Sequence, residues 1–205
     1  MILPDPPILV ITDRRQCPEP LEDRVAALFR GGCRFLSLRE KDMARDERRT
    51  LLERLIGIGQ PFGATVGVHD DPTAALSCGG TLHLPAGGDI SAARSLLGEN
   101  TTIGQSCHNR AEVAAAVGGG ADYVTISPIF ASASKPGYAP LEDPANVIAG
   151  FTIPIFALGG IAHDTMRGLP AGFAGVAVMG QAMTAPDPSA WFAALRTAWQ
   201  FSRRA

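Results

Sequence analysis

Short apolar runs rich in β-branched residues recur along the chain, and most are followed by stretches whose apolar positions repeat every three or four residues. The first pattern indicates buried parallel strands, and the second indicates the helices that cover them. Eight strands are predicted, at residues 8–13, 34–41, 65–70, 81–85, 101–107, 122–130, 153–160 and 175–180. Helices are predicted between and after them, among them residues 21–30, 46–56, 91–97, 110–119 and 188–201.

Eight strand–helix units in 205 residues predict the α/β class and a closed (β/α)8 TIM barrel. The alternation continues to both ends without a linker, so residues 1–205 are expected to form a single β/α barrel domain. An open doubly wound sheet is the alternative, because the order of strands in a sheet cannot be read from the sequence.

Composition narrows the range of partners. Hydrophobic residues make up 46% of the chain and aromatic residues only 6%, so the core is expected to consist mainly of aliphatic side chains. The formal net charge is -2, which creates no overall field that would attract nucleic acid or an anionic membrane. No apolar segment approaches the roughly 20 residues that span a bilayer. We therefore expect no nucleic-acid partner and no membrane association, and any anionic partner must be bound locally.

The cysteines and the first residues bear on the cellular compartment. Cys17, Cys33, Cys78 and Cys107 are scattered without CxxC spacing, which predicts neither a zinc site nor a disulfide framework. The segment MILPDPP has no basic leader before an apolar run, so no signal peptide is predicted. Both features favour the cytoplasm. The sequence leaves open whether the chain forms a homo-oligomer.

Polar side chains gather where the predicted strands end. Active sites of β/α barrels lie at the carboxyl ends of the strands, and charges there need a polar ligand because a buried strand would leave them without partners. The residues at these positions are Arg39, Glu40, Lys41, His69, Asp70, Ser106, Cys107 and His108, with Ser132, Ser134 and Lys135 in the loop after strand 122–130.

Arg39 and Lys41 are two residues apart, which places both side chains on the same face of their strand. Two cations at a strand end suit a phosphate or diphosphate group. An ion pair with Glu40 or Asp42 is the alternative. Residues 132–137 (SASKPG) add hydroxyls, an ammonium group and a glycine, which suit the binding of an anion; an ordinary polar loop is the alternative there.

Glycines follow the last two predicted strands, at Gly159, Gly160 and Gly180, and Met179 precedes the last of them. Loops after the seventh and eighth strands of β/α barrels commonly bind phosphate through backbone N–H groups. The alternative is that these glycines only permit tight turns from strand to helix.

Asp70 ends an apolar strand and is the first candidate ligand for Mg²⁺, a cation that prefers carboxylate and phosphate oxygens. Asp71 and Asp89 are the second candidates. Because Asp71 precedes Pro72, it is better interpreted as a helix cap.

Histidines supply the candidates for proton transfer. His108 is suited to act as a general acid or base, although it could instead cap the helix that begins near Asn109. His83 has weaker support as a site residue, and His163 is assigned no chemistry.

The order and spacing of several motifs resemble the thiamine phosphate synthase and thiazole tautomerase (TenI) superfamily along nearly the whole chain. These motifs are ILVITD, LREKD, VHDDPTAAL, LHLPAGGD, GQSCHNRAEV, GADYVTISPIFASASKPG, IPIFALGGI and AGFAGVAVMGQAM. For a synthase, the resemblance implies a transferase of thiamine biosynthesis. It would join hydroxymethylpyrimidine diphosphate to hydroxyethylthiazole phosphate and release pyrophosphate, with magnesium assisting the departure.

The resemblance also implies roles for individual residues. Arg39 and Lys41 would hold the diphosphate, Asp70 would bind magnesium and Ser106 would contact the pyrimidine. The remaining candidates divide between two phosphate groups: Ser132, Ser134 and Lys135 would stabilise the leaving pyrophosphate, and Gly160, Met179 and Gly180 would surround the thiazole phosphate.

Several positions depart from the synthase pattern. Ser37 stands where the family usually has glutamine, and His69 stands where it usually has asparagine; both are kept as substrate-binding candidates. Ser132 and Ser134 replace threonines and retain the hydroxyls. Asp89, the second magnesium candidate, lies about one residue off the usual spacing.

Two other functions therefore remain. LHLPAGG is closer to the tautomerase branch, for which the resemblance implies proton transfer on a thiazole carboxylate phosphate, no cofactor, and His108 as the proton carrier. The presence of Asp70 and Lys41 favours the synthase. A non-catalytic ligand-binding or regulatory protein is the third hypothesis, and the departures at Ser37 and His69 motivate it.

Overall fold

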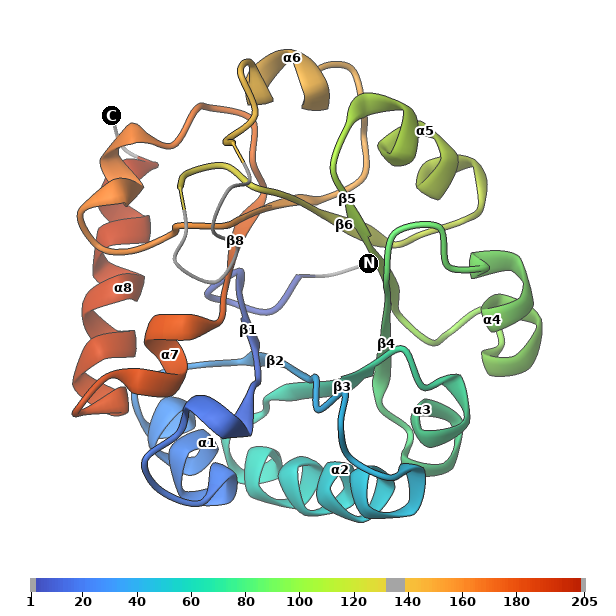
Figure 1. Cartoon of the computed structure of the whole chain (residues 1–205), viewed down its shortest axis with the longest axis vertical. Coiled ribbons are helices and arrows are strands. Elements are labelled where there is room, and N and C mark those ends of the chain that lie inside the picture. The colour runs from blue at the N-terminus through green and yellow to red at the C-terminus, as the bar shows by residue number, and fades with distance from the viewer. Residues whose placement is uncertain (1–2, 132–138, 204–205) are drawn as a thin grey trace.

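The structure, a computed structural model, describes residues 3–131 and 139–203. Eight parallel strands form a ring and helices surround it (Figure 1). The strands are β1 (Ile8–Ile11), β2 (Phe35–Leu38), β3 (Thr65–His69), β4 (Thr81–Leu84), β5 (Ile103–Cys107), β6 (Tyr123–Ile126), β7 (Ile155–Leu158) and β8 (Gly175–Val178). The helices are α1 (Leu21–Arg30), α2 (Arg45–Gly59), α3 (Pro72–Cys78), α4 (Ile90–Leu97), α5 (Arg110–Gly118), α6 (Pro144–Ile148), α7 (Gly180–Thr184) and α8 (Pro188–Ser202), with 3-10 turns η1 (Arg14–Gln16), η2 (Gln60–Phe62) and η3 (Thr165–Gly168).

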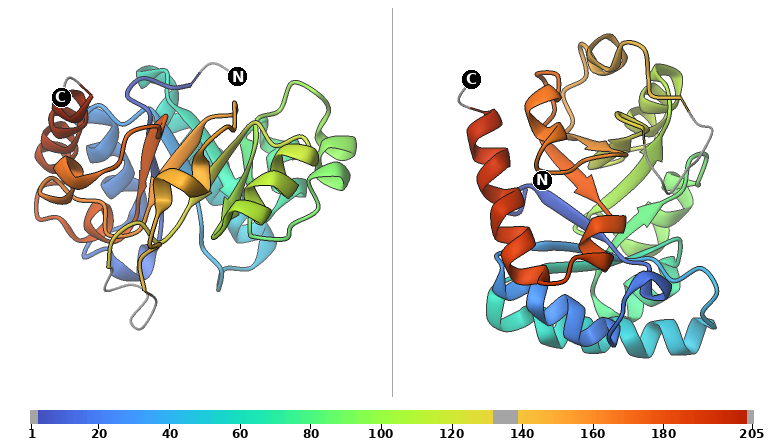
Figure 2. Two further views of the ribbon diagram at one scale, coloured as in Figure 1. Left: turned by 90° about the horizontal axis from the view of Figure 1, so that it is seen from above. Right: turned by 60° about the vertical axis from the view of Figure 1, so that its left-hand side comes forward.

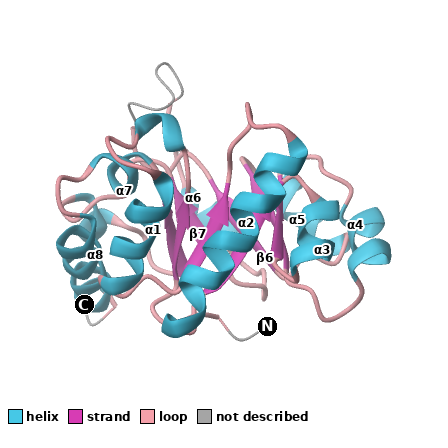
Figure 3. Ribbon diagram, turned by 90° about the horizontal axis from the view of Figure 1, so that it is seen from below, coloured by secondary structure: helices cyan, strands magenta, loops and turns pink. Residues whose placement is uncertain are grey.

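The strands pair in chain order and the ring closes where β8 pairs with β1. In the closing pair Ile8 lies opposite Val176 and Val10 lies opposite Val178. The structure thus confirms the TIM barrel and excludes the open sheet. Side views show the strands flanked by helices (Figure 3), with α8 outside the barrel against α1 and α7 (Figure 2).

The predicted strands are correctly placed, but several end earlier than the sequence indicates. The strand predicted at residues 34–41 ends at Leu38. The next backbone N–H, that of Arg39, donates to the hydroxyl Oγ1 of Thr12 at 2.9 Å instead of to a carbonyl of the sheet. The polar residues beyond the apolar run are thereby released from the ladder into the loop above the barrel.

Five helices begin after an Asp or Asn whose side chain accepts the backbone N–H three residues later. These capping residues are Asp71, Asp89, Asn109, Asp143 and Asp187. Such a cap satisfies one of the N–H groups that the first turn of a helix leaves without a partner. The prediction that Asp71 is a helix cap is confirmed.

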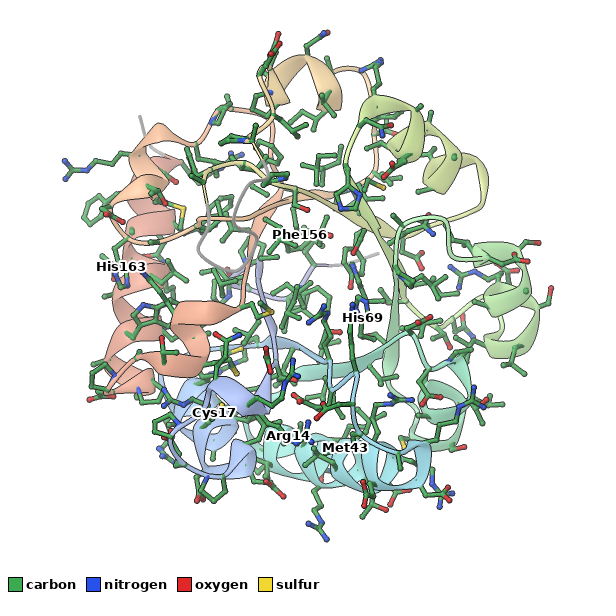
Figure 4. All side chains as sticks on the ribbon, viewed as in Figure 1. Arg14, Cys17, Met43, His69, Phe156 and His163 are labelled. Carbon is green, nitrogen blue, oxygen red and sulfur yellow. The ribbon has the colours of Figure 1, made fainter. Side chains whose placement is uncertain are left out.

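Two apolar clusters hold the barrel together. The larger lies between the strands and the helices, and the smaller lies inside the ring, where Leu9, Ile11, Phe35, Tyr123 and Phe156 meet. Figure 4 shows the side chains of Phe156 and His69 inside the ring, whereas Cys17 and His163 belong to the surrounding layer. Apolar side chains therefore fill part of the barrel interior. Polar residues line the cavity at the carboxyl ends of the strands. No helix within residues 3–131 and 139–203 is long and apolar enough to cross a membrane.

Candidate active site

A cavity of about 880 Å³ opens at the carboxyl ends of the strands. We call it the main cavity. Nine of the residues singled out in the sequence line it: Arg39, Lys41, His69, Ser106, His108, Gly159, Gly160, Met179 and Gly180. A second cavity of about 410 Å³, the side cavity, is lined by Asp70 and shares Arg39, Lys41 and His69 with the main cavity. The two cavities therefore have a common wall that carries the cations.

Two of the substrate- and metal-binding candidates line neither cavity, and three others lie outside the described residues. Ser37 lies on β2, and its buried hydroxyl has no hydrogen-bond partner in the described part of the chain. Asp89 caps α4 by accepting the Ala92 N–H at 2.9 Å and lines neither cavity. Ser132, Ser134 and Lys135 lie outside the described residues.

The alternative of an ion pair between the strand-end cations and Glu40 or Asp42 is wrong. Arg14 binds both carboxylates, with Nη1 3.0 Å from Glu40 Oε2 and 2.7 Å from Asp42 Oδ1. Arg39 and Lys41 form no ion pair with any residue in the described ranges. Their positive charges are left for a ligand.

Glu40 positions other residues of the site, a role that its place at a predicted strand end did not reveal. Its buried carboxylate accepts hydrogen bonds from Thr12 Oγ1 at 2.7 Å and from the backbone N–H of Arg14 at 3.1 Å. Since Thr12 in turn accepts the Arg39 N–H, this network fixes the backbone from which Arg39 extends into the cavity. These residues meet because β1 and β2 are neighbours in the barrel, so the residues that follow the two strands lie side by side.

His69 lies at the wall between the two cavities and is neutral. Burial, together with the positive charges of Arg39 and Lys41, lowers the pKa of its imidazole to about 4. Its Nδ1 atom is buried without a hydrogen-bond partner in the described part of the chain. A polar ligand atom beside His69 would satisfy that nitrogen.

His83, which had weak support as a site residue from the sequence, forms hydrogen bonds with two other residues inside the barrel. Its Nδ1 lies 3.0 Å from the hydroxyl of Tyr123, and its Nε2 lies 2.9 Å from Ser106 Oγ. Tyr123 and His83 are both buried, each with 1% of its surface exposed. Ser106, which lines the main cavity, is therefore connected to a buried polar pair inside the barrel.

His108 lies at the rim of the main cavity, immediately before α5. Its Nδ1 is 3.1 Å from Glu112 Oε2, which also accepts the backbone N–H of His108. The helix cap itself is Asn109, whose side chain accepts the Glu112 N–H. The proposed capping role thus belongs to Asn109, and His108 keeps its ring at the cavity.

Two glycines shape the opposite wall of the main cavity. Gly159 and Gly160 have φ values of 98° and 64°, a left-handed region that favours glycine. A Cβ on Gly160 would overlap the carbonyl oxygen of Ala131. Thr165 holds this turn by donating its hydroxyl to the Gly160 carbonyl at 2.8 Å. Gly180, the first residue of α7, lines the same cavity.

Asp70 is the candidate magnesium ligand that lines a cavity. No group of three or more His, Cys, Asp or Glu side chains suited to a metal ion occurs among the described residues. Mg²⁺, however, usually keeps several waters and is held by one or two carboxylates together with substrate phosphates. One carboxylate facing a cation-lined cavity fits that mode of binding, with most ligands supplied by water and substrate.

Comparisons with known proteins agree with this geometry. The family model described as thiamine monophosphate synthase matches residues 8–182. The thiamine-phosphate synthase of Thioalkalivibrio sulfidiphilus is 35% identical over 182 residues, which cover 84% of this chain and 84% of that protein. The thiamine-phosphate synthase of Marinobacter nauticus is 36% identical over 183 residues, which cover 85% and 82%.

A solved structure gives the same result at the level of the fold. The thiamine phosphate pyrophosphorylase from Pyrococcus furiosus superposes with a TM-score of 0.86 and 27% identity, covering 95% of this chain and 96% of that one. The resemblance inferred from the sequence motifs is confirmed. By family model and by relatives along most of its length, the chain belongs to the thiamine monophosphate synthase family.

Proposed function

We propose that the chain is a transferase that couples hydroxymethylpyrimidine diphosphate with hydroxyethylthiazole phosphate and releases pyrophosphate. The observation that carries this proposal is the wall between the cavities. Arg39 and Lys41 stand there without carboxylate partners among the described residues, beside Asp70 in the side cavity. The names of the relatives point to the same reaction.

The reaction breaks one bond and forms another at a single carbon. The C–O bond between the pyrimidine methylene and the diphosphate breaks, and its electron pair leaves on the diphosphate oxygen. The thiazole nitrogen then uses its lone pair to form the new C–N bond. Negative charge grows on the diphosphate as the C–O bond breaks, so fixed cations beside it stabilise the transition state more than the ground state.

The described residues divide this task. Arg39 and Lys41 bind the diphosphate in the side cavity, and Ser106 contacts the pyrimidine in the main cavity. The backbone around Gly160 and Gly180 binds the thiazole phosphate. We assign Ser132, Ser134 and Lys135 to the leaving pyrophosphate on the family motif alone.

Asp70 is the residue that would hold magnesium. A bound Mg²⁺ supplies positive charge to the departing diphosphate without proton transfer. Asp89 is a weaker candidate, because one of its carboxylate oxygens caps α4.

The remaining proposals concern the molecule as a whole. We assign residues 1–205 to one domain, and we place the enzyme in the cytoplasm because all four cysteines are unpaired. Its partners are the two phosphorylated substrates.

An assay with both substrate sets tests the function. Purified protein is incubated with the pyrimidine and thiazole substrates, or with the thiazole carboxylate phosphate tautomer, each with magnesium and with excess chelator. We expect thiamine phosphate only in the mixture that contains the pyrimidine and thiazole substrates together with magnesium. Chelator-resistant tautomer conversion without coupling would establish the tautomerase instead, and absence of turnover in all four mixtures would leave a binding protein.

A further inference from the structure

Four residues lie at one level across neighbouring strands inside the barrel. The strand registers place His69 opposite His83, His83 opposite Gly104 and Gly104 opposite Tyr123. Ser106 follows two residues after Gly104 on β5, so its side chain is on the same inner face, one level closer to the main cavity. The row therefore connects a buried tyrosine to a residue of the cavity wall.

Gly104 makes this connection. A Cβ on Gly104 would overlap the ring of Tyr123, so the ring occupies the space that a side chain on β5 would fill. Tyr123 thereby reaches across β5 to His83, a strand further along. Edge-to-face contacts with Phe35 and Phe156, at centroid distances of 5.5 Å each, hold the ring from the other side.

Counting protons fixes the direction of the hydrogen bonds. His83 is the only hydrogen-bond partner of the Tyr123 hydroxyl in the described part of the chain. Burial lowers the pKa of His83 and raises that of Tyr123, so both are neutral. A neutral imidazole has one N–H and one acceptor nitrogen. If Nδ1 carried the proton, the buried Tyr123 O–H would have no acceptor, which is costly.

The other arrangement satisfies every donor. Tyr123 donates to Nδ1, Nε2 carries the imidazole proton, and this proton is donated to Ser106 Oγ. Ser106 Oγ then accepts the hydrogen bond from His83, so its own hydroxyl hydrogen is free to be donated to a ligand.

We propose that Tyr123, acting through His83, is a positioning residue that holds the Ser106 hydroxyl as a hydrogen-bond donor toward the main cavity. Toward a ligand, this arrangement selects an acceptor atom, such as an unprotonated ring nitrogen, over an N–H group. The assignment of that acceptor to the pyrimidine substrate rests on the proposed function. The direction of the three hydrogen bonds does not.

The first experiment is therefore independent of catalysis. Nitrogen-15 chemical shifts and long-range couplings of the imidazole rings report which nitrogen carries the proton, and the chain has only four histidines to resolve. A His83→Gln variant identifies the His83 signals. We expect protonated Nε2 and unprotonated Nδ1 in His83. Protonated Nδ1 would mean that Ser106 donates to His83, and it would overturn the proposal.

The second experiment is a double-mutant cycle on the enzyme. Tyr123→Phe removes one hydroxyl and keeps the ring packing. It is expected to raise KM for hydroxymethylpyrimidine diphosphate about threefold to tenfold, the effect of one weakened hydrogen bond, and to change KM for the thiazole phosphate less than about twofold. In a Ser106→Ala background the same change should have no effect on KM, because Tyr123 acts only through Ser106.

The cycle separates positioning from general loosening of the barrel. The proposal would be contradicted if Tyr123→Phe raised KM for hydroxymethylpyrimidine diphosphate equally in the wild-type and Ser106→Ala backgrounds. It would also be contradicted if Tyr123→Phe raised KM equally for the pyrimidine and thiazole substrates. If the wild-type protein shows no coupling at all, the proposed function fails, and the histidine spectrum still decides the direction of the hydrogen bonds.

Discussion

Asp70 combines an unusual backbone conformation with a position at a cavity. Its φ is 55°, the one positive value among the described non-glycine residues, and its N–H donates to the His83 carbonyl at 2.9 Å. Residues with a Cβ adopt this region at some energetic cost, although aspartate tolerates it better than most. Such strain is frequent at functional sites. Here it turns the chain sharply after β3, and the Asp70 side chain lies in the side cavity.

The Asp70→Asn variant tests this residue, because it removes one negative charge and changes little volume. If Asp70 holds magnesium, coupling should fall about a hundredfold or more, since a metal ion contributes several kcal/mol to the transition state. Steady-state rates across a magnesium titration measure the effect.

Asp89→Asn is the matched control. Asparagine still caps a helix, so α4 is preserved and the rate is expected to stay within about threefold of wild type. A large loss in this variant would make Asp89 a second ligand. An Asp70→Asn enzyme with an unchanged magnesium dependence would refute the assignment of Asp70.

At the scale of elements, a partly buried ion pair joins α2 to the start of α3. Arg48 on α2 has Nη2 2.6 Å from Asp71 Oδ2, and the other carboxylate oxygen of Asp71 accepts the Ala74 N–H. One side chain thus both caps α3 and ties it to the neighbouring helix. Since α3 follows directly after Asp70, this contact fixes the loop that carries the proposed magnesium ligand.

We expect Asp71→Ala to lower the free energy of unfolding by about 3 kcal/mol or more. Loss of a cap costs about 1 kcal/mol, and the remainder arises because the Arg48 guanidinium, on a side chain only 12% exposed, would lose its carboxylate partner. Urea unfolding measures the change. Asp143→Ala is the control, because Asp143 caps α6 before Pro144 in the same way and takes part in no ion pair within residues 3–131 and 139–203. Equal losses in the two variants would show that Arg48 contributes nothing.

At the scale of the whole molecule, two buried neutral histidines link the stability of the barrel to pH. The pKa of His69 is lowered to about 4 and that of His83 well below its ordinary value of 6.5, both chiefly by burial. Between pH 6.5 and about 4 the unfolded chain binds protons that the folded chain does not. Stability is therefore full above pH 6.5 and is lost as the pH falls below it.

The expected loss is about 1.4 kcal/mol per histidine for each pH unit below 6.5. Urea unfolding at neutral pH and one unit below 6.5 gives the slope. His69→Asn should remove about half of this pH dependence, because it deletes one of the two titrating groups. A slope that is the same in wild type and His69→Asn would show that His69 is accessible to protons in the folded state.

The sequence predicted the barrel and most of the residues around its mouth for the same reason. Apolar runs mark buried strands, and the polar residues directly after them, such as Arg39, Lys41 and Ser106, necessarily lie at one end of parallel strands. It could not predict contacts that depend on register. Nothing local to Tyr123 reveals that Gly104 opens a path to His83, and nothing near Glu40 reveals that it binds Thr12 and Arg14, which follow the neighbouring strand β1.

The pairing of β8 with β1 also concerns the synthesis of the protein. Until residue 178 has left the ribosome, β1 has one edge without a partner, although its residues emerge before those of the other seven strands. Exposed strand edges are templates for pairing with other chains. The open edge of β1 is therefore available for pairing with other chains as long as the nascent chain lacks β8. Once the ring is complete, an edge is exposed again only when one of the eight strand pairs separates.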